Sequence, residues 1–191
     1  MNDRPPTREV LLDAALSVFT EQTYGGAAVA EVAKRAGMSV GTLYRYFPSK
    51  EALGNAVFRR WKGELLDRLT AGADPDEPVR TTFRRAWGGL VAFAAERPDA
   101  FGFLEFQQHE SYLDEQSAAL SARVSAMGEE MVVRGQRVGE IRAGEPLMLL
   151  ALVYGAAVGL ARTIHDGLVL DRAQLAAAED AAWALLAKPE N

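Results

Sequence analysis

Residues 33–50 read AKRAGMSVGTLYRYFPSK, and this stretch decides the fold. Gly37 follows Ala33 by four positions, and a glycine there can take the left-handed backbone conformation that ends a helix without a Cβ clash. Leu43 and Phe47 are also four residues apart, so they share one face of a second helix and can pack on the first. The stretch therefore predicts a helix-turn-helix.

The other face of this second helix carries hydrogen-bonding side chains that a buried helix has no need for. An α-helix fits the major groove of DNA, where an arginine can hold a guanine bidentately and a threonine can touch a thymine methyl group. We therefore expect Thr42 and Arg45 to contact bases. Hydroxyl and ammonium groups are suited to phosphates, although the two tyrosines can instead pack on the helix that follows. The expected DNA-binding residues are Ser39, Gly41, Thr42, Tyr44, Arg45, Tyr46 and Lys50.

The segment from Thr7 to about Trp61 resembles the N-terminal DNA-binding domain of the TetR family of bacterial transcriptional regulators. The matching positions are Phe19, Tyr24, Val29 to Ala33, Gly37, Ser39, Gly41, Thr42, Leu43, Tyr44, Tyr46, Phe47, Lys50, Glu51 and Leu53. Beyond this segment only the order and length of the helices fit the family. One departure is Ala27 and Ala28, where the family usually carries a threonine or serine that caps the second helix. The missing cap costs about 1 kcal/mol.

Composition and charge agree with a regulator of this kind. The chain has 191 residues, is 49% hydrophobic and contains no cysteine, so it can bury a substantial core and has no disulfide or thiolate metal site. Its net charge of −5 is unevenly distributed. Up to residue 62, nine basic residues stand against six acidic ones, a net +3, and the remainder holds twelve against twenty, a net −8. Segregated charge is expected where one end of a protein meets phosphates. Because the chain contains no cysteine, we expect a protein of the reducing cytoplasm.

Helical periodicity dominates the chain, and strand patterns are nearly absent. We expect an all-α fold of about nine helices, in which a three-helix DNA-binding domain precedes a helical ligand-binding and dimerisation domain. The predicted domains are residues 1–62, with the helix-turn-helix at about 29–47, and residues 63–191. A turn-rich break at residues 72–78 lies near this boundary.

Residues 147–164 are apolar nearly all round, which is typical of a helix that is buried on both sides. The apolar run at 146–161 is shorter than the roughly 20 residues of a membrane span, so we expect a buried helix. The resemblance implies that the last two helices of each subunit form a four-helix dimer interface; a contact within one chain is the alternative. The expected interface residues are Met148, Ala151, Gly155, Gly159, Leu175, Ala178, Ala182 and Leu186.

The central helices concentrate bulky, adaptable side chains that suit either an effector pocket or an ordinary core. The family favours the pocket. The candidate lining residues are Trp87, Phe103, Phe106, His109, Met127, Met131 and Tyr154. The expected function is that of a repressor that binds a palindromic operator as a homodimer and is released by a small hydrophobic or aromatic effector. A DNA-binding or architectural dimer that does not switch is the alternative.

An enzyme or metal protein is the other class to consider. Glu105 and His109 lie four residues apart and resemble half of a metal site. However, His165 is the only other histidine, and no phosphate loop, nucleophile elbow or zinc-protease motif occurs. We therefore expect no enzyme activity, no cofactor and no metal site.

Overall fold

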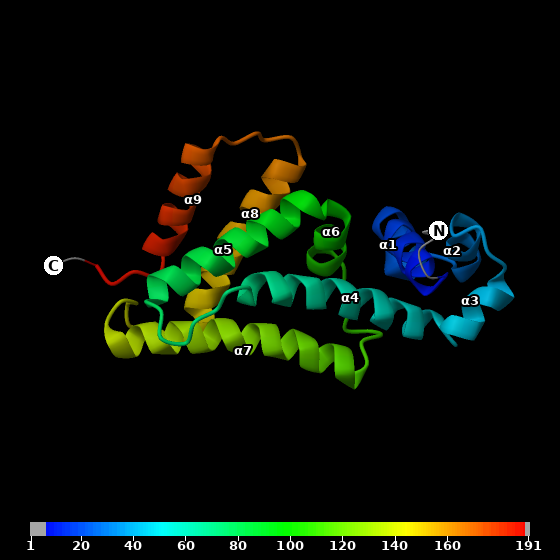
Figure 1. The fold of residues 1–191 in the computed structure, drawn as a ribbon, viewed down its shortest axis with the longest axis horizontal. Coiled ribbons are helices and arrows are strands. Elements are labelled where there is room, and N and C mark those ends of the chain that lie inside the picture. The colour runs from blue at the N-terminus through cyan, green and yellow to red at the C-terminus, as the bar shows by residue number, and fades with distance from the viewer. Residues whose placement is uncertain (1–6, 190–191) are drawn as a thin grey trace. The chain divides into compact units, whose positions relative to one another are not determined.

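The computed structural model describes residues 7–189, which form nine α-helices (Figure 1). The helices are α1 (Thr7–Gly26), α2 (Val29–Arg35), α3 (Val40–Tyr46), α4 (Lys50–Thr70), α5 (Val79–Glu96), α6 (Pro98–Phe106), α7 (Glu115–Val138), α8 (Pro146–His165) and α9 (Arg172–Ala184). Apart from one isolated bridge between Ile141 and Ala187, residues 7–189 contain no β-structure. The predicted all-α fold is confirmed.

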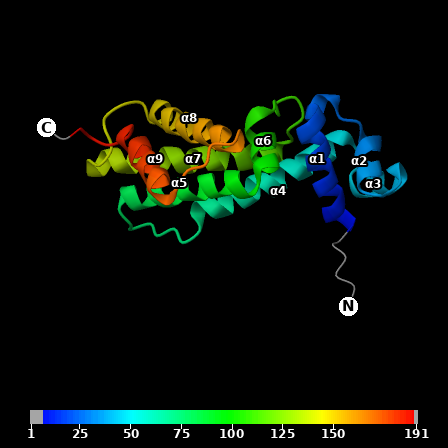
Figure 2. The same cartoon turned by 90° about the horizontal axis from the view of Figure 1, so that it is seen from above.

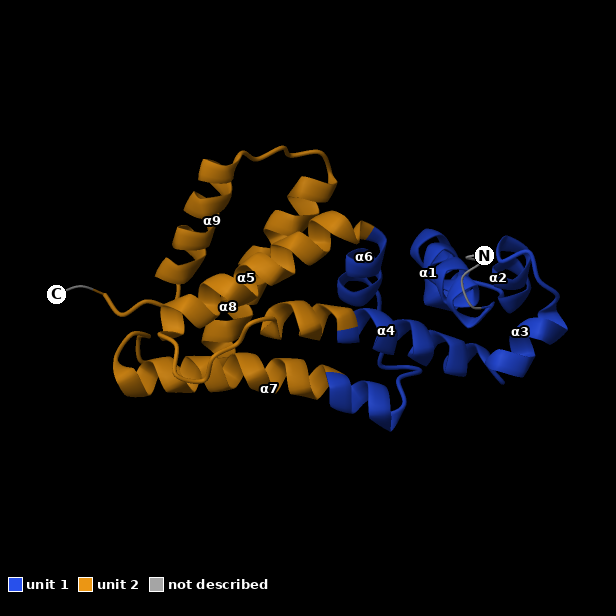
Figure 3. Cartoon of the chain, in the orientation of Figure 1, with its two compact units in different colours: residues 1–63, 99–120 blue, residues 64–98, 121–191 orange. Residues whose placement is uncertain are grey.

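The helices form two compact units, drawn in different colours in Figure 3. The first unit comprises residues 1–63 and 99–120, and the second comprises residues 64–98 and 121–191. Helices α4 and α7 each contribute to both units. As a result, α6 and the start of α7 belong with the N-terminal helices, although they lie far along the chain.

The helix-turn-helix in the first unit has the local geometry that its sequence predicts. Gly37 adopts a φ of +67°, and the amide of Met38 donates to the carbonyl of Ala33 over 2.9 Å. This is the left-handed turn that satisfies the last carbonyls of a helix. Leu43 and Phe47 are buried, so one face of α3 packs inward and the opposite face is left to solvent.

Two amide side chains, the half-buried Gln107 and the buried Asn55, join the loop after α6 to the N-terminal helices of the same unit. Gln107 donates to the carbonyl of Phe19 over 2.7 Å and accepts from the amide of Tyr24 over 2.9 Å. Asn55 of α4 donates to the carbonyl of Tyr112 over 2.7 Å. Because these side chains satisfy backbone groups of α1 and of the loop after α6, they tie that loop to α1 and α4.

In the second unit, α5 packs against α8 and α9, and α8 packs against α9 (Figures 1 and 2). Arg80 of α5 forms ion pairs with Glu179 and Asp180 of α9, and its guanidinium lies 5.1 Å from the ring centroid of Trp183. Asp171 caps the start of α9 in a complete capping box with Gln174.

Helix α8 is buried in its own chain along one stripe only. The buried residues are Leu149, Val153, Ala157 and Ala161. By length and composition alone, this 20-residue helix could cross a membrane. Only 22% of its most apolar stretch is buried inside the chain. Contacts within one chain therefore bury only the side of α8 that α5 and α9 cover, and the other side stays exposed, as the predicted dimer interface requires.

Candidate DNA interface and dimer surface

The start of α3 is held by two hydroxyl groups. Ser39 precedes the helix and accepts a hydrogen bond from the amide of Thr42 over 3.1 Å, while the two side-chain oxygens lie 3.0 Å apart. This is an N-cap, in which a serine oxygen satisfies an otherwise unpaired helix amide. The cap fixes both hydroxyl groups at the first turn of the helix, which is the part of a recognition helix that approaches base edges.

The outward face of α3 carries the side chains that the sequence predicts there. Tyr44 and Tyr46 are 46% and 41% exposed, and Arg45 is also exposed. The two tyrosine rings are thus not part of the core, which disfavours their packing on α4. Gly41 is exposed next to them. Thr42, next to the cap, is half-buried. The outward face of α3 thus offers hydroxyl and guanidinium donors within less than two helical turns.

Lys50 is less free than the sequence suggests. Its ammonium donates to the carbonyl of Gly25 over 3.2 Å and lies 4.7 Å above the ring of Tyr24. Both partners are at the end of α1, so Lys50 ties the first turn of α4 to α1. Burial, with a smaller effect of Glu51, raises the pKa of Tyr24 to about 12. An ammonium has three donors, and the hydrogen bond to Gly25 uses only one of them.

Helix α2 has no side-chain cap, as its two preceding alanines predict: Ala28 occupies the N-cap position and makes no side-chain hydrogen bond. The helix is anchored instead through Arg35, which donates two hydrogen bonds to Glu21 and one to Ser17 of α1. The hydrogen bond to Arg35 holds the pKa of Glu21 below its ordinary value. Lys34 projects from α2 with its side chain largely exposed, a cation of the helix-turn-helix that the motif alone did not single out.

The candidate effector residues do not form one group within either unit. Phe103, Phe106 and His109 belong to the first unit, and Trp87, Met127, Met131 and Tyr154 belong to the second. Phe103 and Trp87 are buried, Phe106 and Tyr154 are exposed, and both methionines are half-buried. Trp87 stacks on Phe83 with ring centroids 5.9 Å apart. This is an ordinary core contact, and Trp87→Ala would cost about 3–5 kcal/mol of stability.

His109 is fully engaged inside the first unit. Its Nε2 lies 2.8 Å from the carbonyl oxygen of Phe103, and its Nδ1 lies 2.6 Å from the hydroxyl of Tyr112. Because a carbonyl only accepts, Nε2 carries the proton and Nδ1 accepts from the tyrosine. Burial lowers the pKa of His109, which also favours the neutral ring. Within residues 7–189, no three histidine, aspartate or glutamate residues are grouped so as to hold a metal ion.

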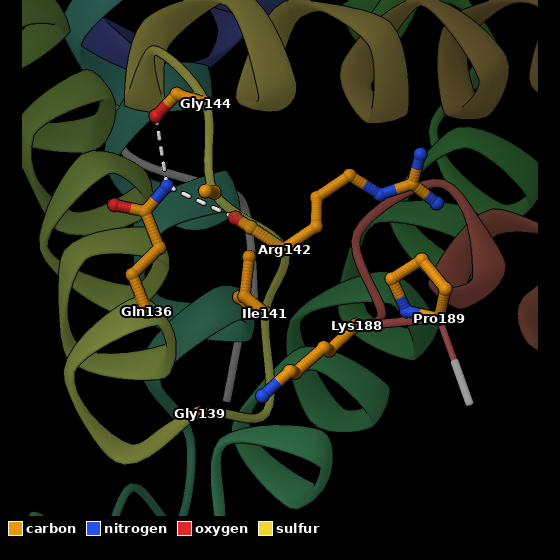
Figure 4. A pocket seen from close by; sticks show the side chains of 8 residues that line it. Gln136, Gly139, Ile141, Arg142, Gly144, Lys188 and Pro189 are labelled. Atoms are coloured by element: carbon orange, nitrogen blue, oxygen red, sulfur yellow. Dashed lines mark hydrogen bonds between the residues drawn. The ribbon is translucent and has the colours of Figure 1, made fainter. Parts of the chain in front are cut away.

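A pocket of about 510 Å³ lies in the second unit at the turn between α7 and α8 (Figure 4). Gln136 closes one side of it by donating to the carbonyls of Arg142 and Gly144. The lining residues are Gln136, Gly139, Ile141, Arg142, Ala143, Gly144, Lys188 and Pro189. None of the predicted effector residues lines this pocket.

The predicted dimer residues separate into an exposed set on α8 and a mostly covered set on α9. Met148, Ala151, Gly155 and Gly159 are exposed. On α9, Leu175 and Ala178 are half-buried. Ala182 and Leu186 are buried inside their own chain, so they cannot contact a partner and leave the predicted interface. The exposed face of α9 is instead a stripe of small residues, Ala173, Ala177, Ala181 and Ala184.

Two family models together cover almost the whole chain. The model described as "Bacterial regulatory proteins, tetR family" matches residues 11–57. The model described as "Tetracyclin repressor-like, C-terminal domain" matches residues 58–187. The second match alone spans more than half of the chain.

Individual relatives agree with these matches. The chain is 33% identical over 69 residues to the fatty acid metabolism regulator protein of Bacillus subtilis, a match that covers 36% of each protein. It is 29% identical over 164 residues to the transcriptional regulator BetI of Stenotrophomonas maltophilia, with 71% of this chain and 84% of the relative covered.

Solved structures show the same fold. A TetR family protein from Vibrio parahaemolyticus superposes with a TM-score of 0.77 at 26% identity, covering 96% of this chain and 100% of that protein. The exposed polar face of a capped α3, the family matches and the shared fold lead to one conclusion. The chain belongs to the TetR family, and it is a DNA-binding transcriptional regulator of the cytoplasm rather than an enzyme.

Proposed function

We propose that the protein is a repressor that binds a palindromic operator as a homodimer and is released by a small hydrophobic effector. In this proposal residues 1–62 bind DNA, and residues 63–191 dimerise and bind the effector, with α4 shared between them. Membership of the family implies operator binding and dimerisation. The contacts within each unit support the finer assignments.

The exposed groups of α3 support a division of labour on DNA. Arg45 has the planar guanidinium that pairs with guanine, and Thr42 stands at the first turn of the helix, so we assign base contacts to these two residues. Ser39, Tyr44, Tyr46 and Lys50 supply hydroxyl and ammonium donors, which we assign to phosphates. Gly41 lets the backbone approach the groove.

The bare apolar face of α8 supports the assignment of the dimer surface. Leu147, Met148 and Leu152 are each more than half exposed in the single chain. A contiguous apolar surface of this kind marks an interaction site. Ala151, Gly155 and Gly159 run beside it at intervals of four, and small residues at this spacing let two helices approach closely. We place α8 and the alanine stripe of α9 in the interface, which gives the dimer two recognition helices for two half-sites.

Contacts of two side chains support the proposal that DNA binding responds to a ligand. Gln107, directly after α6, holds the backbone of both Phe19 and Tyr24 in α1, and Arg59 of α4 pairs with Asp114 over 2.7 Å. Any ligand that displaces α6 must therefore move or break contacts with helices of the DNA-binding region. A coupling of about 1–3 kcal/mol is enough for regulation.

The test begins with the operator, found by selecting fragments of genomic DNA that the purified protein retains. Operator affinity is then measured with and without a panel of apolar compounds. One relative is named for fatty acid metabolism, so medium-chain lipids belong in the panel. A compound that raises thermal stability and weakens operator binding supports the proposal. Compounds that bind and leave operator affinity unchanged support the dimer that does not switch.

A further inference from the structure

An incomplete polar pair lies between α4 and α6 in the first unit. The side chains of Lys62 and Glu105 are only 11% and 9% exposed, and the nearest distance between them, from Nζ to Oε1, is 3.8 Å. That distance is too long for a hydrogen bond. Oε1 of Glu105 is buried and accepts no hydrogen bond from any residue between 7 and 189.

Such a pair is costly as it stands. Burying two opposite charges requires the loss of their hydration, and their attraction offsets that loss only when hydrogen bonds satisfy the remaining donors and acceptors. Buried polar atoms in proteins nearly always have a partner. Lys62 lies on α4 and Glu105 on α6, and apolar side chains at both positions would avoid this cost. The pair therefore needs a third polar atom that can form a hydrogen bond with each of the two side chains.

We propose that this third atom is the polar end of the effector, which would be an uncharged group that both donates and accepts a hydrogen bond. This inference rests on the proposed effector-responsive function and specifies the chemical class of the ligand. In an alcohol, a hydroxyl oxygen placed about 2.8 Å from both atoms fits their 3.8 Å separation. It accepts from Nζ of Lys62 and donates its proton to Oε1 of Glu105.

The charges of the pair exclude other ligand ends. A carboxylate has no proton for Glu105 and is repelled by it, and a quaternary ammonium has no donor and is repelled by Lys62. An alcohol or a primary amide satisfies both partners. His109, which lies in the same unit, cannot take over this role, because Phe103 and Tyr112 already occupy both of its ring nitrogens.

Four probes with eight carbons in the main chain test the proposal: octan-1-ol, octanamide, octanoate and octyltrimethylammonium. Binding to the full-length, DNA-free protein is measured by titration calorimetry, and thermal stability provides a second reading. We expect the alcohol or the amide to bind at least about tenfold more tightly than either charged probe, a difference of about 1.4 kcal/mol. Equal affinity for octanoate, or no binding by any probe up to its solubility limit, would overturn the proposal.

Single substitutions should then change which of the charged probes the protein binds more tightly. Glu105→Gln keeps the shape of the side chain and leaves Lys62 unbalanced, so octanoate should gain about tenfold relative to octanamide. Lys62→Met leaves Glu105 unbalanced and should favour octyltrimethylammonium. Glu96→Gln is the control, because Glu96 pairs with Arg68 at an exposed position. If Lys62→Met fails to fold, the isosteric Glu105→Gln variant alone decides, and an unchanged ranking of the probes overturns the proposal.

Operator binding separates this inference from the proposed function. Probe binding that depends on Glu105 without any loss of operator affinity supports the polar site and contradicts an effector role. Release of the operator by an apolar compound, with equal potency in the native protein and in Glu105→Gln, supports the effector role and overturns the site.

Discussion

Replacing Gly155 by leucine tests the dimer surface with little disturbance of the single chain. Gly155 is exposed on α8, and a Cβ built on it meets no atom within 4 Å. A leucine side chain at this position therefore begins in open space. Leucine is also a better helix former than glycine, by nearly 1 kcal/mol. The substitution should accordingly leave the fold of the isolated subunit intact or slightly stabilise it.

The expected effect on the dimer is large because both subunits carry the substitution. In a two-fold symmetric interface each subunit presents the same patch. Overpacking typically costs about 1–3 kcal/mol per site, so two sites cost about 2–6 kcal/mol per dimer. Since about 1.4 kcal/mol corresponds to a tenfold change, the dimer dissociation constant should rise by roughly 30-fold to 20,000-fold.

Sedimentation equilibrium over a range of concentrations measures this constant, and circular dichroism checks that helix content is retained. Gly88→Leu is the matched control, because Gly88 is an exposed glycine of α5 that also has no atom within 4 Å of a built Cβ. The control should dimerise like the native protein. An unchanged dissociation constant for Gly155→Leu, or equal weakening by both variants, would refute the assignment of this face.

Three further predictions concern DNA binding and the first unit. Arg45→Ala should weaken operator binding by about 1–3 kcal/mol and relax the preference at one base pair per half-site, whereas Lys50→Ala should weaken binding to all sequences and reduce its salt dependence; equal loss of sequence preference would contradict this division. Burial lowers the pKa of His109, so below about pH 6.5 the unfolded chain binds more protons than the folded chain and the free energy of unfolding should fall as the pH drops. His109→Gln should remove that part of the pH dependence in urea titrations, and an unaltered slope would argue against it. Gln107→Ala breaks two hydrogen bonds to the backbone and should lower the free energy of unfolding by about 1–3 kcal/mol, a prediction that fails if urea midpoints coincide.

Features set by a few neighbouring residues could be predicted from the sequence. The turn at Gly37, the inward placement of Leu43 and Phe47 and the capping box at Asp171 all depend on contacts within a helical turn or two. The boundaries of α8 follow from Pro146 at its start and from a continuous apolar run. Such local signals act before any tertiary contact forms, so one sequence is enough to show them.

Features set by packing between distant segments could not be predicted. The sequence indicates that α9 has an apolar side, yet alanine occurs around most of this helix, so periodicity alone does not tell which alanines face the core. The structure buries Ala182 and leaves Ala181 exposed. Likewise, no local pattern links Lys62 to Glu105, because their approach depends on how α6 packs on α4.

Three polar contacts of the first unit join the same two regions of the chain. Gln107 reaches back to α1, Arg59 of α4 reaches Asp114, and Lys62 of α4 faces Glu105. All of them join helices of the DNA-binding region to the segment at residues 99–120, and the last of them is the one that lacks a hydrogen bond. Glu105 and Gln107 are two residues apart, so a ligand that binds between Lys62 and Glu105 acts on the same short segment that holds α1. Under the proposed function, the unsatisfied pair and the contacts to α1 would place ligand recognition and control of the DNA-binding helices on one short segment, without requiring a signal to cross the rest of the protein.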